Sequence, residues 1–136
     1  MKMLSRFLVM AVGGDRYALP FGQVTEVTEM RPLSPIPRAP AWCLGATRSH
    51  GTVVAVVDLA AYLDGEPEPD PQKLVVLDLH TGSLAVQVGP VTTLVTESQD
   101  CVHQDQRGRW LETEQGPAVL LESHELVHEV AAAMAR

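Results

Sequence analysis

The hydrophobic pattern of the chain centres on one run of five apolar residues, Val53–Val57, most of which are β-branched. Gly51 and Asp58 bound this run, which predicts a short strand buried on both faces. Asp58 also precedes the stretch Leu59–Leu63, whose spacing predicts a helical turn capped by the Asp58 carboxylate. Together, the tight turn, the buried strand and the closing helical turn predict the spine of a small barrel.

Polar and apolar positions elsewhere predict further strands and a strap. Residues 7–12 are apolar throughout and precede the turn Gly13–Arg16, which predicts a hairpin. Thr25–Thr28 alternates in polarity, as a half-exposed strand does. Four prolines within residues 30–40 predict an extended strap laid on a core, with a flexible spacer as the alternative. The acidic, proline-rich stretch 64–71 predicts an exposed connection between two halves of the chain.

The second half of the chain repeats the first. A shift of 67 positions aligns Leu8 with Val75, Val9 with Val76, Ala18 with Ala85, Gly22 with Gly89, Val24 with Val91 and Val27 with Leu94. A shift of 64 positions aligns residues 54–58 with 118–122. Such a repeat predicts two similar five-stranded barrels with a groove where they meet. The expected fold class is therefore all-β, with short helical turns and a C-terminal helix that either docks or frays.

Composition and charge narrow the function. The chain has 136 residues with ten Gly and ten Pro, which suits short strands joined by turns. Its net charge is -7 and its Lys and Arg residues are scattered, which argues against nucleic acid or an anionic membrane as a partner. No run approaches the roughly 20 apolar residues of a membrane span. Two cysteines without an export signal favour reduced thiols, so we expect a cytoplasmic protein.

The sharpest catalytic alternative is a zinc hydrolase site at residues 124–128, which read His-Glu-Leu-Val-His. On a helix the two histidines share a face, and in zinc peptidases such a pair holds the metal while the glutamate acts as general base. A third ligand would have to come from Glu129, Cys101 or His103. No nucleotide-binding loop or nucleophile motif accompanies this one, so we expect solvated histidines, no cofactor and no enzyme activity.

Several features occur together in one known family. The residues that carry the likeness are Phe7-Leu8-Val9, Gly13-Gly14, Tyr17-Ala18-Leu19, Val24, Glu26-Val27, Ala39-Pro40, Trp42, Gly45, Gly51 and Val56-Val57-Asp58-Leu59. In order and spacing they make the chain resemble the CheW family of chemotaxis adaptors. The resemblance implies one CheW-like domain at residues 5–130, followed by a tail at 131–136. It also implies two intertwined SH3-like barrels, whose halves, 17–71 and 74–121, exchange strands.

The resemblance implies a function as well. Members of the family are scaffolds without catalytic activity that link the cytoplasmic tips of chemoreceptors to the histidine kinase CheA. In the family the receptor tip lies in an apolar groove between the barrels, and the barrel ends contact the regulatory domain of the kinase. Other CheW-like proteins are further candidate partners. We therefore expect an adaptor.

This chain departs from the family pattern near its central strand. Where the family usually reads Asn-Leu-Arg-Gly, the chain has Arg48-Ser49-His50-Gly51, and the usual proline of the following strand is Ala55. A histidine is mostly neutral at pH 7, so we expect His50 to hold a carboxylate weakly or not at all. An acidic residue common in the second barrel is missing at Gly89-Pro90-Val91. An alternative function is therefore a divergent accessory protein that binds the receptor without coupling the kinase.

Partner contact is expected from apolar side chains in the groove and from exposed loop tips, because burying a Val or Leu side chain contributes roughly 1.5–3 kcal/mol. The loop candidates are Arg48 and His50. The candidates for the groove, each with the core as its alternative, are Val53, Val54, Val56, Val86 and Val88.

Overall fold

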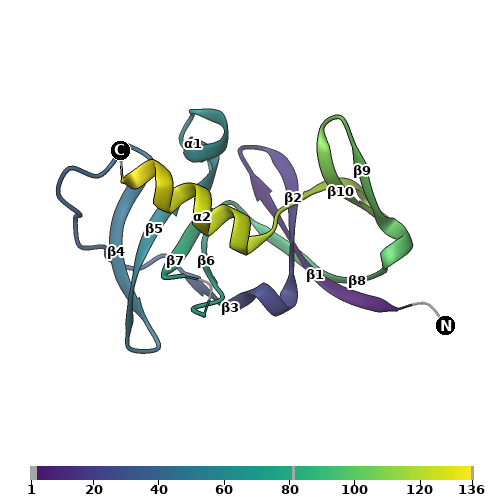
Figure 1. Ribbon diagram of the computed structural model, residues 1–136, viewed down its shortest axis with the longest axis horizontal. Helices are drawn as coiled ribbons and strands as arrows, with labels where there is room; N and C mark the ends of the chain where they lie inside the picture. Colours follow the sequence, from purple (N-terminus) through teal and green to yellow (C-terminus); the bar gives the residue numbers. More distant parts are fainter. Residues whose placement is uncertain (1–2, 81, 136) are drawn as a thin grey trace.

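Alternating polar and apolar segments form two β-sheets in the computed structural model, which describes residues 3–80 and 82–135 (Figure 1). The strands are β1 (Leu4–Val12), β2 (Asp15–Pro20), β3 (Val24–Glu29), β4 (Cys43–Ser49), β5 (Thr52–Asp58), β6 (Lys73–Leu77), β7 (Leu84–Val88), β8 (Val91–Ser98), β9 (Val102–Asp105), β10 (Gly108–Thr113) and β11 (Gly116–Leu120). The helices are α1 (Leu59–Asp64) and α2 (Ser123–Met134), with short 3-10 turns η1 (Phe21–Gln23) and η2 (Gln99–Cys101). The expected all-β fold with a C-terminal helix is confirmed.

One sheet has six strands in the order β8-β1-β2-β11-β10-β9, and the other has five in the order β3-β6-β7-β5-β4. We call them the six-stranded and the five-stranded sheet. Most neighbouring strands are antiparallel, whereas β11 with β2 and β5 with β7 are parallel. The prediction of five strands in each barrel is therefore correct for the five-stranded sheet. The six-stranded sheet has β9 as an additional edge strand.

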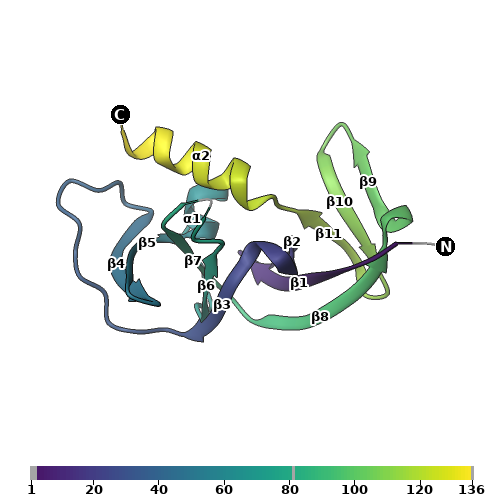
Figure 2. The same ribbon diagram turned by 60° about the horizontal axis from the view of Figure 1, so that its bottom comes forward.

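The internal repeat reappears in the strand register. Leu8 pairs with Leu19 in the six-stranded sheet, and the residues 67 positions later, Val75 and Val86, pair in the five-stranded sheet. Each sheet joins a hairpin from one half of the chain to strands of the other half, as Figure 2 shows for β1 and β2 beside β8 and β11. The expected halves, 17–71 and 74–121, therefore do not coincide with the two sheets.

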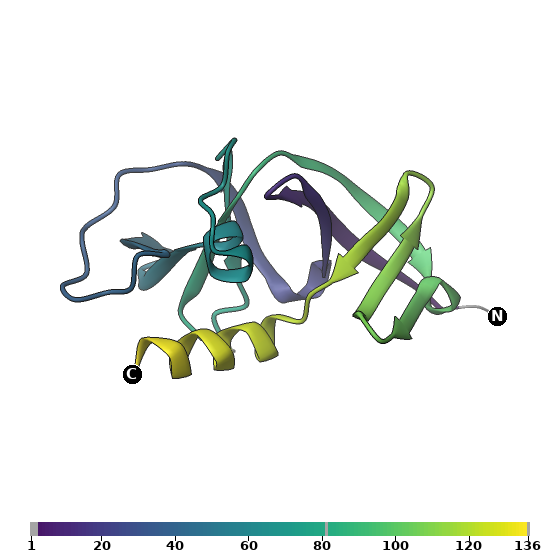
Figure 3. The same cartoon turned by 90° about the horizontal axis from the view of Figure 1, so that it is seen from above.

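The buried apolar side chains of the two sheets form three clusters. The largest lies between them and includes Leu19, Val86 and residues of α2, and we call it the shared core. The opposite face of each sheet has a smaller cluster, represented by Leu111 in the six-stranded sheet and Val54 in the five-stranded sheet. Helix α2 lies along the five-stranded sheet (Figure 3). Because both sheets contribute to one apolar core, they stabilise each other.

The C-terminal helix is docked and does not fray from the sheet. Leu126 and Val130 are buried in the shared core. The helix runs to Met134 and so includes residues 131–134 of the expected tail, whose last residue lies outside the described chain. The apolar spacing of these residues explains the docking, since it places one face of the helix on the sheet. Within the described residues, no helix has the length and apolar character needed to cross a bilayer.

Two local expectations are confirmed. The Asp58 carboxylate accepts a hydrogen bond from the backbone N–H of Ala61 at 3.2 Å and so caps α1. The proline-rich segment is a strap, because Leu33 packs against the core of the five-stranded sheet and Ser34 forms a bridge with Ala46 of β4.

Two burial expectations are wrong. Val53 is 57% exposed, because it lies on the opposite face of β5 from Val54 and beyond the residues that β7 covers, which are Ala55–Asp58. Glu68, within the stretch 64–71 expected to be exposed, is only 7% exposed. Both errors arise because burial depends on neighbouring elements that the local pattern does not reveal.

Candidate partner-binding surface

At the border of the shared core, each sheet has an apolar side chain that is partly exposed. Leu94 of β8 lies directly opposite Leu8 of β1, a shared-core residue, so the two side chains are on one face. Val27 of β3 lies opposite Val75 of β6, which is also in the shared core. Leu94 is 44% exposed and Val27 is 38% exposed. We call Val27 and Leu94 the intersheet rim.

The two rim residues occupy equivalent positions of the internal repeat. Their strands, β3 and β8, each follow a connection between the sheets, and they lie on the same side of the molecule where the sheets meet (Figures 1 and 2). A single exposed apolar residue is common on protein surfaces. A matched pair at the border of a core is a candidate binding surface.

The turn between β4 and β5 holds the predicted loop residues. His50 and Gly51 have φ angles of 49° and 79°, the left-handed pair that suits a two-residue hairpin turn. Arg48 lies opposite Val53 across the ladder, and both are exposed. Among the described residues, the Arg48 guanidinium makes no ion pair. The turn therefore presents a cation and an apolar side chain on one face.

A polar cluster fixes this turn to β3. Glu26 Oε1 accepts a hydrogen bond from Arg31 Nη2 at 2.8 Å, and Glu26 Oε2 lies 2.9 Å from His50 Nε2 and accepts from Ser49 Oγ at 3.2 Å. Arg31 Nη1 donates to the Arg48 carbonyl at 2.6 Å. Since β3 and β4 are the edge strands of the five-stranded sheet, the cluster bridges its two edges. At this turn the Glu26 carboxylate lies beside His50 and also accepts a hydrogen bond from Arg31.

The cluster favours the ionised form of Glu26. Burial alone would raise the pKa of its carboxyl, but hydrogen bonds from Arg31 and Ser49 and the charges of Arg31 and His50 hold that pKa below its usual value. A general acid or base working near neutral pH needs a carboxyl pKa shifted in the opposite direction. Glu26 is therefore suited to holding structure.

The remaining groove candidates are core residues. Val54, Val56, Val86 and Val88 are each 0% exposed. Val86 and Val88 belong to the shared core, and the other two belong to the smaller cluster of the five-stranded sheet. Because a side chain without exposed surface does not contact a docked partner, the groove assignment is wrong for these four and stays open only for Val53.

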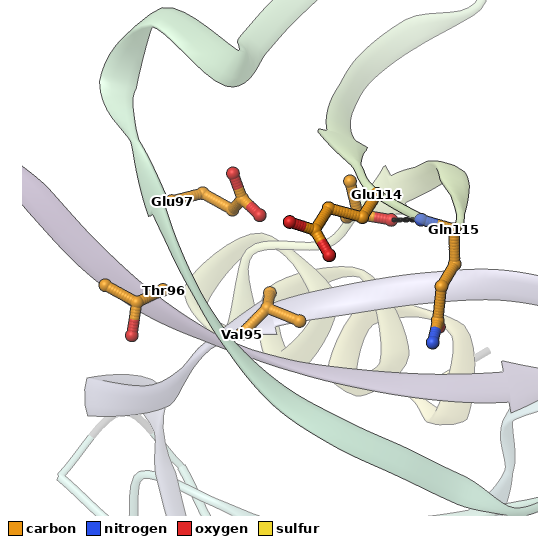
Figure 4. Close-up of a pocket in the computed structure, with 6 residues that line it drawn as sticks. Val95, Thr96, Glu97, Glu114 and Gln115 are labelled. Carbon is orange, nitrogen blue, oxygen red and sulfur yellow. Dashed lines mark hydrogen bonds between the residues drawn. The ribbon is translucent and has the colours of Figure 1, made fainter.

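Two cavities lie on the six-stranded sheet. One of about 280 Å³ is lined by residues 95–97 and 113–115, and Figure 4 shows the carboxylates of Glu97 and Glu114 facing each other across it. The other, of about 740 Å³, lies beside Trp110. Both are open surface hollows, and like charges facing each other make the first unsuited to an apolar ligand.

The catalytic alternatives find no support in the part of the chain that the structure describes. His124 and His128 are exposed on α2, and no group of three or more His, Cys, Asp or Glu residues is placed to hold a metal there. Burial, a hydrogen bond with Glu97 and nearby carboxylates raise the pKa of the Cys101 thiol. A protonated thiol is a poor nucleophile.

Comparison with known proteins places this architecture. Residues 6–126 match the family described as CheW-like domain. This chain belongs to the CheW-like domain family. The resemblance seen in its motifs is thereby confirmed, and so is the fold of two intertwined SH3-like barrels with a C-terminal helix.

Two relatives of this CheW-like domain are informative. Protein FrzA of Myxococcus xanthus is 34% identical over 89 residues, which are 65% of this chain and 55% of FrzA. The chain thus spans about half the length of that relative. The crystal structure of the scaffolding protein TtCheW from Thermoanaerobacter tengcongensis matches with a TM-score of 0.80 at 15% identity, covering 93% of this chain and 89% of TtCheW. At that identity the likeness concerns the fold alone.

Sequence reasoning about this CheW-like domain missed the intersheet rim. The signal was present, because the repeat aligns Val27 with Leu94 and apolar residues shared by two repeats have a common environment. Whether that environment is core or surface depends on how far the neighbouring elements extend over the strand, which only the assembled sheets show.

Proposed function

We propose that this CheW-like domain is a non-catalytic adaptor of a cytoplasmic chemosensory array, and that it binds the cytoplasmic tip of a chemoreceptor at the intersheet rim. The observation that carries the proposal is the exposure of Val27 and Leu94 at equivalent positions of the two sheets. Because each side chain is already more than half buried, burying its exposed part against a partner contributes somewhat less than half of the roughly 1.5–3 kcal/mol for a fully exposed Val or Leu.

The second contact of the adaptor is the regulatory domain of a CheA-type kinase, at the turn between β4 and β5. Arg48 and Val53 supply a permanent cation and an apolar contact on one face. One observation favours the accessory alternative: His50 lies 2.9 Å from Glu26 and is already engaged within the chain. In that alternative the protein binds the receptor and leaves the kinase unbound.

Calorimetry with a chemoreceptor tip fragment tests the rim. Val27→Asp and Leu94→Asp should each weaken binding at least about ten-fold, because a charge replaces buried apolar surface. Val119→Asp is the matched control, since Val119 is 42% exposed on β11 and lies outside the rim. Equal losses in all three variants, or none in the rim variants, would refute this surface.

A parallel titration with the kinase regulatory domain separates the two functions. Wild-type protein that binds both partners, with Arg48→Glu weakening only the kinase, supports the coupling adaptor. Receptor binding alone supports the accessory protein. A well-folded sample that binds neither partner at tens of micromolar contradicts both.

A further inference from the structure

The connection between α1 and β6 carries a buried carboxylate. Glu66 and Asp70 of this connection are exposed, whereas Glu68 between them is 7% exposed. Glutamate is rarely buried unless its oxygens are satisfied by hydrogen bonds. Its burial in an otherwise exposed acidic segment therefore needs a structural reason.

Hydrogen bonds connect the Glu68 carboxylate to the six-stranded sheet and the Glu68 backbone N–H to the five-stranded sheet. Its Oε1 accepts a hydrogen bond from the N–H of Gly13 at 2.8 Å, in the turn between β1 and β2 of the six-stranded sheet. Its Oε2 accepts from the N–H of Asp70 at 3.1 Å, and its own N–H donates to Asp58 Oδ2 at 3.1 Å, at the end of β5 in the five-stranded sheet. Hydrogen bonds to an ionised carboxylate are stronger than neutral ones.

The same carboxylate lies against the connection that leads from β7 to β8. Gly89 donates its N–H to the Ala11 carbonyl at 2.9 Å, and Ala11 donates to the Pro90 carbonyl at 2.9 Å. A Cβ on Gly89 would lie 3.0 Å from the Ala11 oxygen and 3.2 Å from Glu68 Oε2. Glu68 thus lies at one point against both the turn of one sheet and the crossover into β8.

We propose that Glu68 is a positioning residue, a clasp that joins the two sheets at this crossover and fixes where β8 begins. Since Leu94 is on β8 and Val27 is on β3, the clasp holds the two members of the intersheet rim in one fixed arrangement. Preorganised surfaces bind more tightly because less freedom is lost on association. The inference rests on the proposed function for its binding consequence, and on the free protein for the clasp itself.

Amide hydrogen exchange of the free protein tests the clasp directly. In Glu68→Gln the amide group has one acceptor oxygen and presents N–H donors to the second backbone N–H, so at least one of the Gly13 and Asp70 amides should exchange at least about ten-fold faster. The acceleration should extend to Gly89. Glu66→Gln is the matched control, because it removes the same charge from an exposed side chain two residues away.

A second variant changes Gly89, the residue that faces the Glu68 carboxylate, and leaves Glu68 itself unchanged. Gly89→Ala leaves Glu68 in place but puts a methyl group against its carboxylate and the Ala11 oxygen, so the same amides should be affected. Acceleration confined to the connection itself, with Gly13 unchanged in both variants, would overturn the clasp.

Binding of the receptor tip fragment tests the positioning role. Glu68→Gln, measured where it is fully folded, should weaken binding several-fold, while Glu66→Gln binds as wild type does. A purely structural role would lower the melting temperature without changing the affinity, and that result would overturn the positioning role even if exchange at Gly13 increases. If wild type itself fails to bind, the proposed function fails, and the exchange data still decide whether the clasp exists.

Discussion

Apart from the additional strand β9, the two sheets have equivalent strand orders, with β8-β1-β2-β11-β10 corresponding to β3-β6-β7-β5-β4. In each sheet an arginine links a strand to the equivalent turn, but the groups that accept its hydrogen bonds differ. In the five-stranded sheet Arg31 donates to the carboxylate of Glu26 and to the carbonyl of Arg48, which ties β3 to the turn between β4 and β5. The bond to Glu26 is an ion pair at 2.8 Å between half-buried side chains.

In the six-stranded sheet Arg16 of β2 reaches the equivalent turn, between β10 and β11. It donates to the carbonyl of Gly116 at 3.1 Å, to the hydroxyl of Thr113 at 3.2 Å and to the side-chain carbonyl of Gln115 at 3.4 Å. These acceptors are neutral. The comparison teaches that a repeated topology does not require repeated chemistry, and that the fastening of the five-stranded sheet is the one that depends on a charge pair.

The largest expected effect comes from the shared core, which makes the two sheets one unit. Leu19→Ala should lower the free energy of unfolding by about 2–5 kcal/mol, because Leu19 is fully buried between the sheets. Urea unfolding followed by fluorescence in single-tryptophan variants reports each sheet separately, through Trp42 before β4 and Trp110 in β10. Coincident midpoints are expected, and two separate transitions would show that the sheets unfold independently.

Removing the two arginines sharpens the comparison. Arg31→Met and Arg16→Met should each cost about 1 kcal/mol of unfolding free energy in dilute buffer. In about 1 M salt the cost of Arg31→Met should shrink, since screening weakens the ion pair, while that of Arg16→Met should persist. Denaturation midpoints at both salt concentrations measure this, and identical salt responses would contradict the assignment of charge to one sheet only.

Acid should distinguish the sheets in the same way. The folded-state pKa of Glu26 lies below the usual 4.5, so the unfolded state binds the proton first as the pH falls. The stability that Glu26 contributes is therefore complete above its unfolded pKa and is lost as the pH falls through the folded pKa. The difference in unfolding free energy between wild type and Glu26→Gln should accordingly narrow below about pH 4.5. A difference that stays constant down to pH 3 argues against this linkage.

The smallest expected effect concerns β9, the strand without a counterpart in the five-stranded sheet. The His103 ring stacks on Trp110 of β10 with ring centroids 4.4 Å apart. His103→Ala should cost only about 0.5 kcal/mol, because the stack is partly exposed. Hydrogen exchange should accelerate within Val102–Asp105 and remain unchanged in β4 and β5. Acceleration throughout both sheets would mean that β9 supports the whole fold.

The fold could be predicted from the sequence because the internal repeat aligns residues that pair equivalently in the two sheets. The shift that aligns Leu8 with Val75 also aligns Leu19 with Val86, and these residues pair as the alignment requires. The cap of α1 was equally readable, because Asp58 precedes an apolar helical stretch and acts locally.

The candidate site was less readable because it depends on contacts that are distant in sequence. The β-branched run predicted burial correctly for Val54 and Val56 but not for Val53, which lies on the other face of β5, beyond the residues that β7 covers. Composition marked Glu68 as solvent-exposed, yet its partner Gly13 lies 55 positions away. Period and propensity describe short windows of the chain, whereas these two outcomes depend on the exchange of hairpins between the sheets.

That exchange has a consequence for synthesis. The first hairpin, Leu4–Pro20, pairs with β8 and β11, and β11 ends at Leu120 of a chain of 136 residues. While the chain emerges from the ribosome, this hairpin cannot pair with β8 or β11 until those later strands have been made. A fragment ending in the acidic connection would leave both sheets incomplete, whereas a fragment ending after β7 would contain every strand of the five-stranded sheet and only the first hairpin of the six-stranded one.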